Sequence, residues 1–395
     1  MGSVPPSLVV PLPVASPAVM CENGGFSSFG IRMTSAAQPY FIQALRASAA
    51  LTILWHHFAL YAPLTEWAAP LLGDLLSWLA RYARATQVFF VVSGFVAAQT
   101  IGSRVWRFSQ LGRFVLQRYC RLGLPYLAIV LAILPIYEFA RGWVPDDVLG
   151  QPVSLAQFLA HLLFLQDILG YEALSAGLWF VCINFQLGFG YAFGMMLQQR
   201  FGRGGDSLFA VLGWGTSIYS LFHFSLDPSG DSWALYFFPY FFMGILVHKA
   251  LARRSQGELA AFQCLLVLAV LYEWRWRLVI AMLFGTLLFV AERSGLGQRW
   301  PRSRWISGLG KISFSLFLVH FPVLILVGAL WARLGWDTPA LAVGGLLVAF
   351  VASVVGAWFF HRWVETPAAL LSKRFRAPRR ADEGGAGGQR LVLEH

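Results

Sequence analysis

YFIQALRASAALTILWHHFALY, residues 40–61, is a nearly continuous apolar stretch that contains three ionisable side chains, Arg46, His56 and His57. About 20 helical residues span about 30 Å, the hydrocarbon thickness of a bilayer, so the stretch predicts a transmembrane helix. An Arg in such a helix costs roughly 2.5–3.5 kcal/mol on insertion scales, and ionisable groups at that depth normally face a cavity or a partner. The stretch therefore predicts a membrane protein and a functional position inside it.

Arg46 and His57 share one side of this helix. They are eleven residues apart, which at about 100° per residue brings them within about 20° of each other and about 16 Å apart along the axis. One stripe thus presents a permanent cation and a titratable base, a combination that suits catalysis. The alternative is that Arg46 snorkels to the interface and His57 only bonds to a neighbouring helix.

The composition of the whole chain agrees with a membrane protein. Of its 395 residues, 57% are hydrophobic and 12% are charged, whereas soluble domains carry about 25% charged residues. Lys and Arg in loops on one side of the membrane explain the net charge of +11, so we expect no nucleic-acid partner. The cysteines lack metal-ligand spacing, and the chain contains no GxxxxGK[ST], HExxH or GxSxG sequence, so we expect no metal.

Apolar runs predict an all-α, polytopic fold with about ten transmembrane helices. We place them near residues 40–61, 86–101, 123–140, 175–197, 208–224, 234–249, 259–272, 277–291, 311–331 and 340–360. Lys and Arg gather in alternate loops, which places both termini in the cytoplasm and assigns Arg81 and Arg84 to an outer loop.

Three parts of the chain differ in composition. Residues 1–38 form a loosely ordered leader, residues 39–367 form the transmembrane domain, and residues 368–395 form a basic, low-complexity cytoplasmic tail. Within the transmembrane domain, residues 154–168 are amphipathic and predict an interfacial or re-entrant helix.

Arg118 and Arg121 lie at the cytoplasmic edge of the third predicted span. Their spacing of three residues predicts one shared helix face. Two guanidinium groups on one face could bind phosphate or pyrophosphate. Simple anchoring by positive charge is the other interpretation.

Other polar residues within the predicted spans have structural interpretations beside functional ones. His320 lies in the middle of the ninth span, where a lone His is more often a link between helices than a catalyst. Ser93 precedes Gly94 in the second span, a pair that favours close helix packing. His161 lies on the amphipathic segment and is a candidate contact to an acceptor. Thr366, followed by Pro, predicts the N-cap of a short cytoplasmic helix.

In this order, the motifs resemble the acyltransferase 3 family of bacterial membrane O-acyltransferases over residues 39–367. The most specific element is an Arg, ten residues and then a His in the first helix, matched by Arg46 and His57. The others are FFVVSGF at 89–95, the Arg118/Arg121 pair before LGLPY, SFSLFLVHFP at 313–322, and VETP at 364–367.

The resemblance implies an enzyme of the bacterial inner membrane. Such enzymes transfer an acyl group, commonly acetyl from cytoplasmic acetyl-CoA, to a hydroxyl of a glycan, a lipid-linked sugar or a small natural product. The resemblance assigns catalysis to His57 and Arg46, with His57 as general base or covalent relay. Donor binding falls to Arg118 and Arg121, and acyl-CoA is a substrate rather than a resident cofactor.

Supporting roles fall to Ser93, Trp179, Asn184, His320 and Glu365. Many members of the family carry a Glu where this chain has Asn184, so an acidic helper is not expected there. A glycan or lipid exporter or flippase, with Arg46 and His57 lining its pathway, is the alternative function, and a non-catalytic scaffold is a third.

Overall fold

The part of the chain that the structure describes is helical. The computed structural model describes residues 40–102, 104–253, 256–299 and 303–375, and these residues form isolated β-bridges, such as that between Arg141 and Val144, but no strand. The predicted all-α class is therefore confirmed for these residues. The predicted leader at 1–38 and the tail beyond residue 375 lie outside the described residues.

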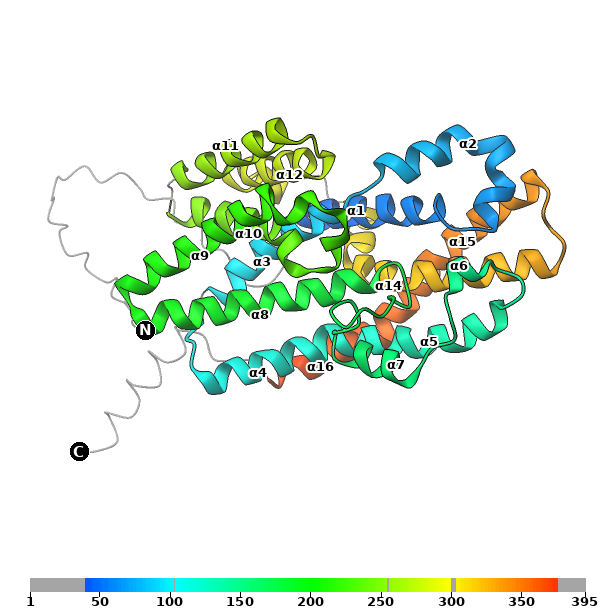
Figure 1. Ribbon diagram of the computed structural model, residues 1–395, viewed down its shortest axis with the longest axis horizontal. Coiled ribbons are helices and arrows are strands. Elements are labelled where there is room, and N and C mark those ends of the chain that lie inside the picture. Colours follow the sequence, from blue (N-terminus) through cyan, green and yellow to red (C-terminus); the bar gives the residue numbers. More distant parts are fainter. Residues whose placement is uncertain (1–39, 103, 254–255, 300–302, 376–395) are drawn as a thin grey trace, which may run out of the picture. The chain divides into compact units, whose positions relative to one another are not determined.

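Each of the ten stretches predicted to span the membrane contains a helix (Figure 1). In chain order these are α1 (Tyr40–Phe58), α3 (Thr86–Ile101), α5 (Leu124–Ala140), α8 (Leu178–Phe201), α9 (Arg203–Phe222), α10 (Ala234–Arg253), α11 (Gly257–Tyr272), α12 (Trp276–Arg293), α14 (Arg304–Arg333) and α15 (Pro339–Phe360).

Five helical segments of the described part are long and apolar enough to cross a membrane. Three are α8, α10 and α14, and two are composite: α4 (Phe108–Arg118) continues into α5, and α15 continues into α16 (Thr366–Lys373). The 19-residue α1 is not among them, because its ionisable and amide side chains lower its mean hydropathy. The ten crossings and the cytoplasmic termini stay predictions.

A helix that the sequence analysis missed, α2 (Leu64–Tyr82), follows α1. It includes Arg81, so the connection after the first predicted span is helical, and the placement of Arg81 on the outer side of the membrane stays a prediction. Acidic residues and a Pro interrupt the apolar run of α2, which hides it from a search for continuous spans. Its buried residues nevertheless recur at helical spacing, and Leu64 packs against Gly345 of α15.

Two π-helical turns lie inside the composite helices. They are η1 (Tyr119–Gly123), between α4 and α5, and η4 (His361–Glu365), between α15 and α16. Such turns often mark functional sites. Because η1 begins directly after Arg118 and contains Arg121, the prediction that these two residues share one regular helix face is wrong. Because η4 carries the helix through Thr366, this residue is not an N-cap.

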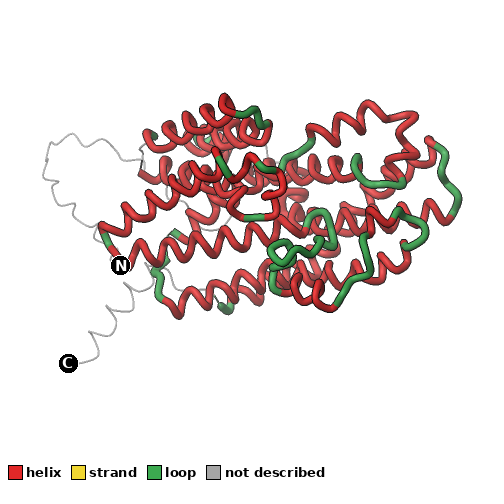
Figure 2. The backbone as a smooth tube through the Cα atoms, viewed as in Figure 1, coloured by secondary structure: helices red, strands yellow, loops and turns green. Residues whose placement is uncertain are grey.

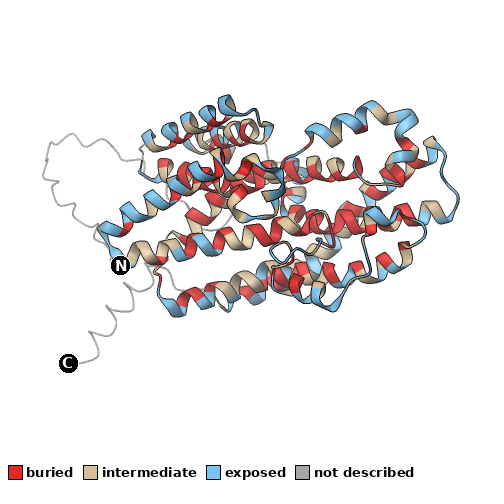
Figure 3. Ribbon diagram, in the orientation of Figure 1, coloured by how far each residue is buried: buried red, intermediate tan, exposed pale blue. Residues whose placement is uncertain are grey.

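The core lies around α14 and α10 (Figure 3). In the most apolar window, 83% of α14 is buried, against 33% of the α15–α16 helix, so α14 runs through the interior. It packs against α1, α5 and α15, while α10 packs along α3. A Cβ atom at Gly94 of α3 or Gly244 of α10 would overlap the facing backbone, so these glycines permit the close packing predicted from the Ser93–Gly94 pair.

The outer surface is apolar, as a bilayer requires. Exposed aliphatic side chains cover one side of α15, namely Leu341, Leu347, Val348, Val351 and Val355. Exposed tryptophans lie near both ends of the helices. Trp274 lies just before α12 and Trp276 begins it, and Trp305 and Trp363 lie at the opposite end. Tryptophan is enriched at both interfaces of membrane proteins.

Candidate active site

A cavity of about 780 Å³ lies where several helix ends meet. Helices α1 and α5 reach it with their C-terminal ends, and α3, α8, α10 and α12 reach it with their N-terminal ends. The segment between α5 and α8, which includes α6 (Asp146–Leu149) and α7 (Leu155–Leu162), completes the wall, and Figure 2 shows its loops beside α8. The volume falls within the range of about 300–1,000 Å³ that is usual for ligand sites.

Aromatic and charged side chains share the wall of this cavity. The aromatic ones are Tyr61, Tyr137, Tyr171, Trp179, Phe237 and Phe321, and the charged ones are Arg84, Asp147, Glu172, Asp231 and Arg277. Burial raises the pKa of the Asp231 carboxyl, although Arg277, 3.9 Å away, favours its charged form. The wall therefore offers positively and negatively charged hydrogen-bonding groups beside the flat faces of aromatic rings.

His57 borders the cavity and is bonded to His320 of α14. Its Nδ1 lies 2.7 Å from Nε2 of His320, whose own Nδ1 lies 3.0 Å from the Leu316 carbonyl oxygen. Because a carbonyl only accepts, Nδ1 of His320 carries a proton, and the neutral ring offers Nε2 as an acceptor. His57 therefore donates from Nδ1, and its neutral ring keeps the lone pair on Nε2.

This chain of bonds determines which nitrogen of His57 can act as a base. A catalytic base is usually held by a third group, and His320 supplies that group here. When Nε2 of His57 takes up a proton, Nδ1 still donates to His320, and hydrogen bonds from a charged donor are stronger than neutral ones. His320 does form the predicted link between helices, and through that link it is a positioning residue for His57.

Arg46 lies towards the opposite end of α1 and is not one of the described residues that line the cavity. It is partly buried, attracted by Glu365 of η4 and repelled by Arg121 of η1. About 16 Å of helix separates it from His57. Arg46 and His57, which were predicted to share one side of this helix, thus lie in two separate environments.

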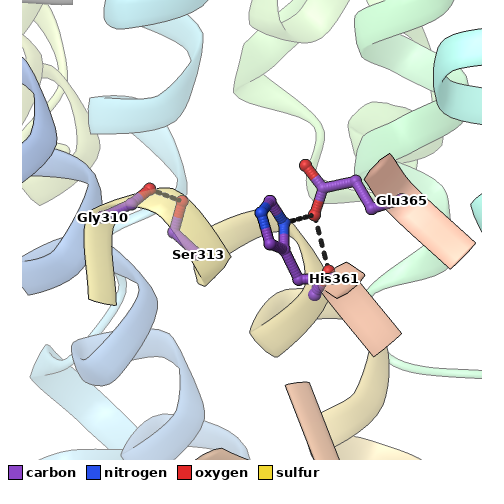
Figure 4. Close-up of polar contacts among 5 residues, drawn as sticks. Gly310, Ser313, His361 and Glu365 are labelled. Atoms are coloured by element: carbon purple, nitrogen blue, oxygen red, sulfur yellow. Dashed lines mark hydrogen bonds and ion pairs between the residues drawn. The ribbon is translucent and has the colours of Figure 1, made fainter. Parts of the chain in front are cut away.

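The carboxylate of Glu365 is fixed by two side chains (Figure 4). Ser315 of α14 donates from Oγ to Oε2 at 2.6 Å, and Nδ1 of His361 lies 2.9 Å from the same oxygen. Glu365, predicted as a supporting residue, therefore has a defined position near Arg46. We call Arg46, Arg121, Ser315, His361 and Glu365 the Arg46 cluster.

Arg118 and Arg121 have different surroundings. Nη2 of Arg118 donates to the backbone oxygen of Asn184 on α8 at 2.6 Å and to its Oδ1 at 3.2 Å. A Cβ at Gly188 would overlap the guanidinium group, so α8 accommodates Arg118 closely. Arg121 is exposed. Arg118 and Asn184 thus tie α4 to α8, and Arg121 is the accessible member of the pair.

The remaining predicted residues divide between the cavity and the packing of the bundle. Trp179 lines the cavity, whereas Ser93 of α3 is partly buried and is not one of its described lining residues. His161 of α7 is buried, and both its nitrogens are engaged: Nδ1 donates to the Gln157 carbonyl (2.8 Å), and Nε2 accepts from the Leu174 N–H (3.1 Å). It positions the cavity wall and does not line it.

Sequence reasoning missed several residues that the fold brings to these two sites. Ser175, Arg84 and Arg277 line the cavity, and His361 binds Glu365. The one feature of the sequence that could have indicated a site was the length of the outer segment between the third and fourth predicted spans, which forms part of the cavity wall. The amphipathic pattern at 154–168 was also only partly right, because α7 ends at Leu162.

A family model described as an acyltransferase domain, that of the acyltransferase 3 family, matches residues 40–362. The match begins with α1, which carries Arg46 and His57, and ends within η4. Comparisons with curated proteins and with solved structures gave no match.

Proposed function

The chain belongs to the acyltransferase 3 family, and we propose that it transfers an acyl group, acetyl in the simplest case, from acyl-CoA to a hydroxyl of a cell-envelope glycan or lipid-linked sugar. The observation that carries the proposal is the position of His57 at the cavity, with His320 occupying Nδ1 and leaving Nε2 as the basic nitrogen. Activation of a hydroxyl requires such a base within reach of the bound acceptor.

In the proposed reaction His57 acts on the acceptor. Nε2 takes the hydroxyl proton while the oxygen attacks the thioester carbonyl, and the C–O bond of the ester forms. The C–S bond then breaks, and the proton passes from His57 to the departing sulfur, so CoA leaves as the thiol. A positioned general base of this kind contributes about 10²–10⁴-fold to the rate.

The wall of the cavity favours a carbohydrate acceptor. A sugar ring has apolar faces and a rim of hydroxyl groups. Trp179 and Tyr61 offer aromatic surface for the faces, and Asp147 and Glu172 offer acceptors for the hydroxyls. In small-molecule sites, polar groups at defined positions usually fix the orientation of the ligand.

The donor is assigned to the Arg46 cluster. Arg121 is exposed and can pair with a phosphate of CoA, while Arg46, held beside Glu365, lies deeper along α1. Arg118 contributes indirectly by fixing α4 against α8. In this assignment the cavity faces outward and the Arg46 cluster faces the cytoplasm of the bacterial inner membrane, an orientation that the distribution of Lys and Arg favours.

The proposal is tested with the purified protein in lipid nanodiscs. The donor is radiolabelled acetyl-CoA, and the acceptor is an envelope glycan extract from the source bacterium, de-esterified with mild alkali. We expect thiol release that depends on the extract, with label recovered in the glycan as an alkali-labile ester. An exporter or flippase would move its substrate without releasing thiol, and that result would contradict the proposal.

A further inference from the structure

Two arginines line the cavity where α3 and α12 begin. Arg84 lies two residues before α3, and Arg277 is the second residue of α12. Both guanidinium groups interact electrostatically with Asp231 and with His56, which also line the cavity. These four residues therefore lie close together in one part of the wall, and we call them the Arg84 corner.

Arg277 is held on one side and open on the other. Its Nη1 donates to the Tyr236 hydroxyl at 3.1 Å, and its guanidinium carbon lies 5.4 Å from the centre of the Tyr236 ring. The Asp231 carboxylate lies 3.9 Å from Nη2, which is too far for a hydrogen bond. Nε and Nη2 therefore keep their hydrogen-bonding capacity, and, unlike Nε of Arg275, neither is sealed from solvent.

The guanidinium group of Arg84 makes no hydrogen bond or ion pair with the described residues. Its side chain is exposed, so a ligand in the cavity can reach it. Its backbone N–H donates to the Tyr82 carbonyl at 2.8 Å, which restrains the chain just before α3. Because Arg84 has no bond to lose, its full hydrogen-bonding capacity is available to a ligand.

The surface that a ligand meets at this corner is cationic. Arg84 and Arg277 supply two positive charges, and Asp231 supplies one negative charge. Asp167 also interacts with Asp231, but it is not one of the described residues that line the cavity. The other carboxylates of the lining belong to the segment between α5 and α8.

An anionic oxygen group matches the Arg84 corner, because guanidinium groups bind phosphate and carboxylate through paired, charge-assisted hydrogen bonds. We propose that Arg84 and Arg277 bind a phosphate or carboxylate of the acceptor, which is therefore an acidic saccharide. The corner lies beside the proposed base, since the ring centres of His56 and His57 are 5.5 Å apart. The inference rests on the proposed acyl transfer and names the substrate class of its cavity.

The test measures initial thiol release in nanodiscs with saturating acetyl-CoA and increasing amounts of the de-esterified envelope glycan extract. For Arg84→Gln we expect the extract concentration at half-maximal rate to rise about tenfold, as for the loss of a hydrogen bond between charged groups. The maximal rate and the KM for acetyl-CoA should stay nearly constant. Because salt screens exposed charges, the difference from the unmodified protein should shrink in about 0.5 M NaCl.

Arg81→Gln is the matched control. Arg81 lies three residues before Arg84, is exposed, and is not one of the described residues that line the cavity. Its replacement removes the same charge from the same connection, so all three kinetic values should stay unchanged. Neither substitution should lower the melting temperature, because neither side chain is bonded within the described part of the chain. If Arg84→Gln fails to fold, Arg84→Lys, which keeps the charge without the paired donors, takes its place, with a smaller shift expected.

Three soluble sugars identify the anionic group. Glucose 1-phosphate, glucuronate and glucose are compared as inhibitors of thiol release at half-saturating extract and saturating acetyl-CoA. We expect one of the two acidic sugars to inhibit the unmodified protein about tenfold more strongly than glucose does, and to lose that advantage in Arg84→Gln. Stronger inhibition by the phosphate indicates a phosphorylated acceptor, and stronger inhibition by glucuronate indicates a carboxylated one.

The inference is overturned if Arg84→Gln leaves the extract dependence unchanged, or if Arg81→Gln shifts it equally. Acidic sugars that inhibit no better than glucose would also overturn it. If the unmodified protein releases no thiol with the extract, the proposed function itself fails. Normal release by the unmodified protein and by Arg84→Gln removes only the anion site.

Discussion

Nδ1 of His57 lies 2.7 Å from Nε2 of His320, and the bond from His320 to the Leu316 carbonyl gives both rings a defined tautomer. The last member of this relay is a backbone carbonyl rather than a carboxylate, so the relay works with both imidazoles neutral. A proton on Nε2 of His320 would remove the acceptor that His57 needs. The base is therefore competent only while His320 is neutral.

Replacement of His320 tests this dependence. In His320→Ala the ring of His57 loses its partner and its tautomer preference, so we expect the maximal rate to fall about tenfold to a hundredfold, with the KM for acetyl-CoA unchanged. In His320→Gln the amide oxygen can accept from Nδ1 of His57, so a substantial part of the rate should return. Equal rates in the Ala and Gln variants would contradict the positioning role.

The two arginines next to η1 should respond differently to substitution. Arg121→Ala should raise the KM for acetyl-CoA about tenfold and leave the melting temperature unchanged, because Arg121 is exposed. Arg118→Ala should lower the melting temperature, because it removes two hydrogen bonds to Asn184, worth about 1–3 kcal/mol. If the KM of the Arg121 variant does not change, this residue only anchors the chain to the membrane.

Glu365 is expected to act through Arg46. Glu365→Gln keeps the shape and an acceptor for Ser315 but removes the charge that attracts Arg46. We expect the KM for acetyl-CoA to rise about threefold to tenfold. Ser315→Ala, which leaves the charge in place, is the control and should have a smaller effect. If the variant changes the dependence of the rate on the glycan extract but not the KM for acetyl-CoA, Glu365 acts on the acceptor, and its assignment to the donor site is wrong.

Asp167, in the segment between α7 and α8, should make stability depend on pH. Burial raises the pKa of its carboxyl from 3.8 to about 6, although a hydrogen bond from Gln166 opposes the shift. The folded protein thus binds this proton more tightly than the unfolded chain, and stability is lost as the pH rises from 3.8 towards about 6.

We therefore expect Asp167→Asn to raise the melting temperature at pH 7.5 and to lose that advantage at pH 4. Asp147→Asn, at an exposed position of α6, is the control. A stabilising effect that is equal at both pH values would show that ionisation of Asp167 is not its cause.

The helices were predictable because each is a long apolar run, and such runs can be recognised without knowing which helices pack against them. Helix α2 was missed because acidic residues and a Pro interrupt its apolar run, and its buried face is completed by α15 and α1, which only the fold brings together. The π-turn that separates Arg118 from Arg121 was missed because spacing arguments assume 3.6 residues per turn.

The candidate site was predictable in part. A His and an Arg inside a predicted span can be recognised from the sequence, because few other residues are as unfavourable in free energy within a bilayer. Their contacts cannot, since His57 and His320 are 263 residues apart and no sequence pattern relates them. Arg84 was predicted only to lie in an outer loop, because only the fold shows that it lines the cavity together with Arg277.

The most direct test of the account compares His57→Ala with His56→Ala in nanodiscs, by thiol release with saturating acetyl-CoA and glycan extract. His56 is a suitable control because it also borders the cavity and also donates from Nδ1, but to the Leu79 carbonyl at 3.2 Å instead of to His320. We expect the His57 variant to insert and melt normally while its rate falls at least about a hundredfold, and the His56 variant to keep most of its activity. A rate at the level of the unmodified protein in His57→Ala would contradict the account.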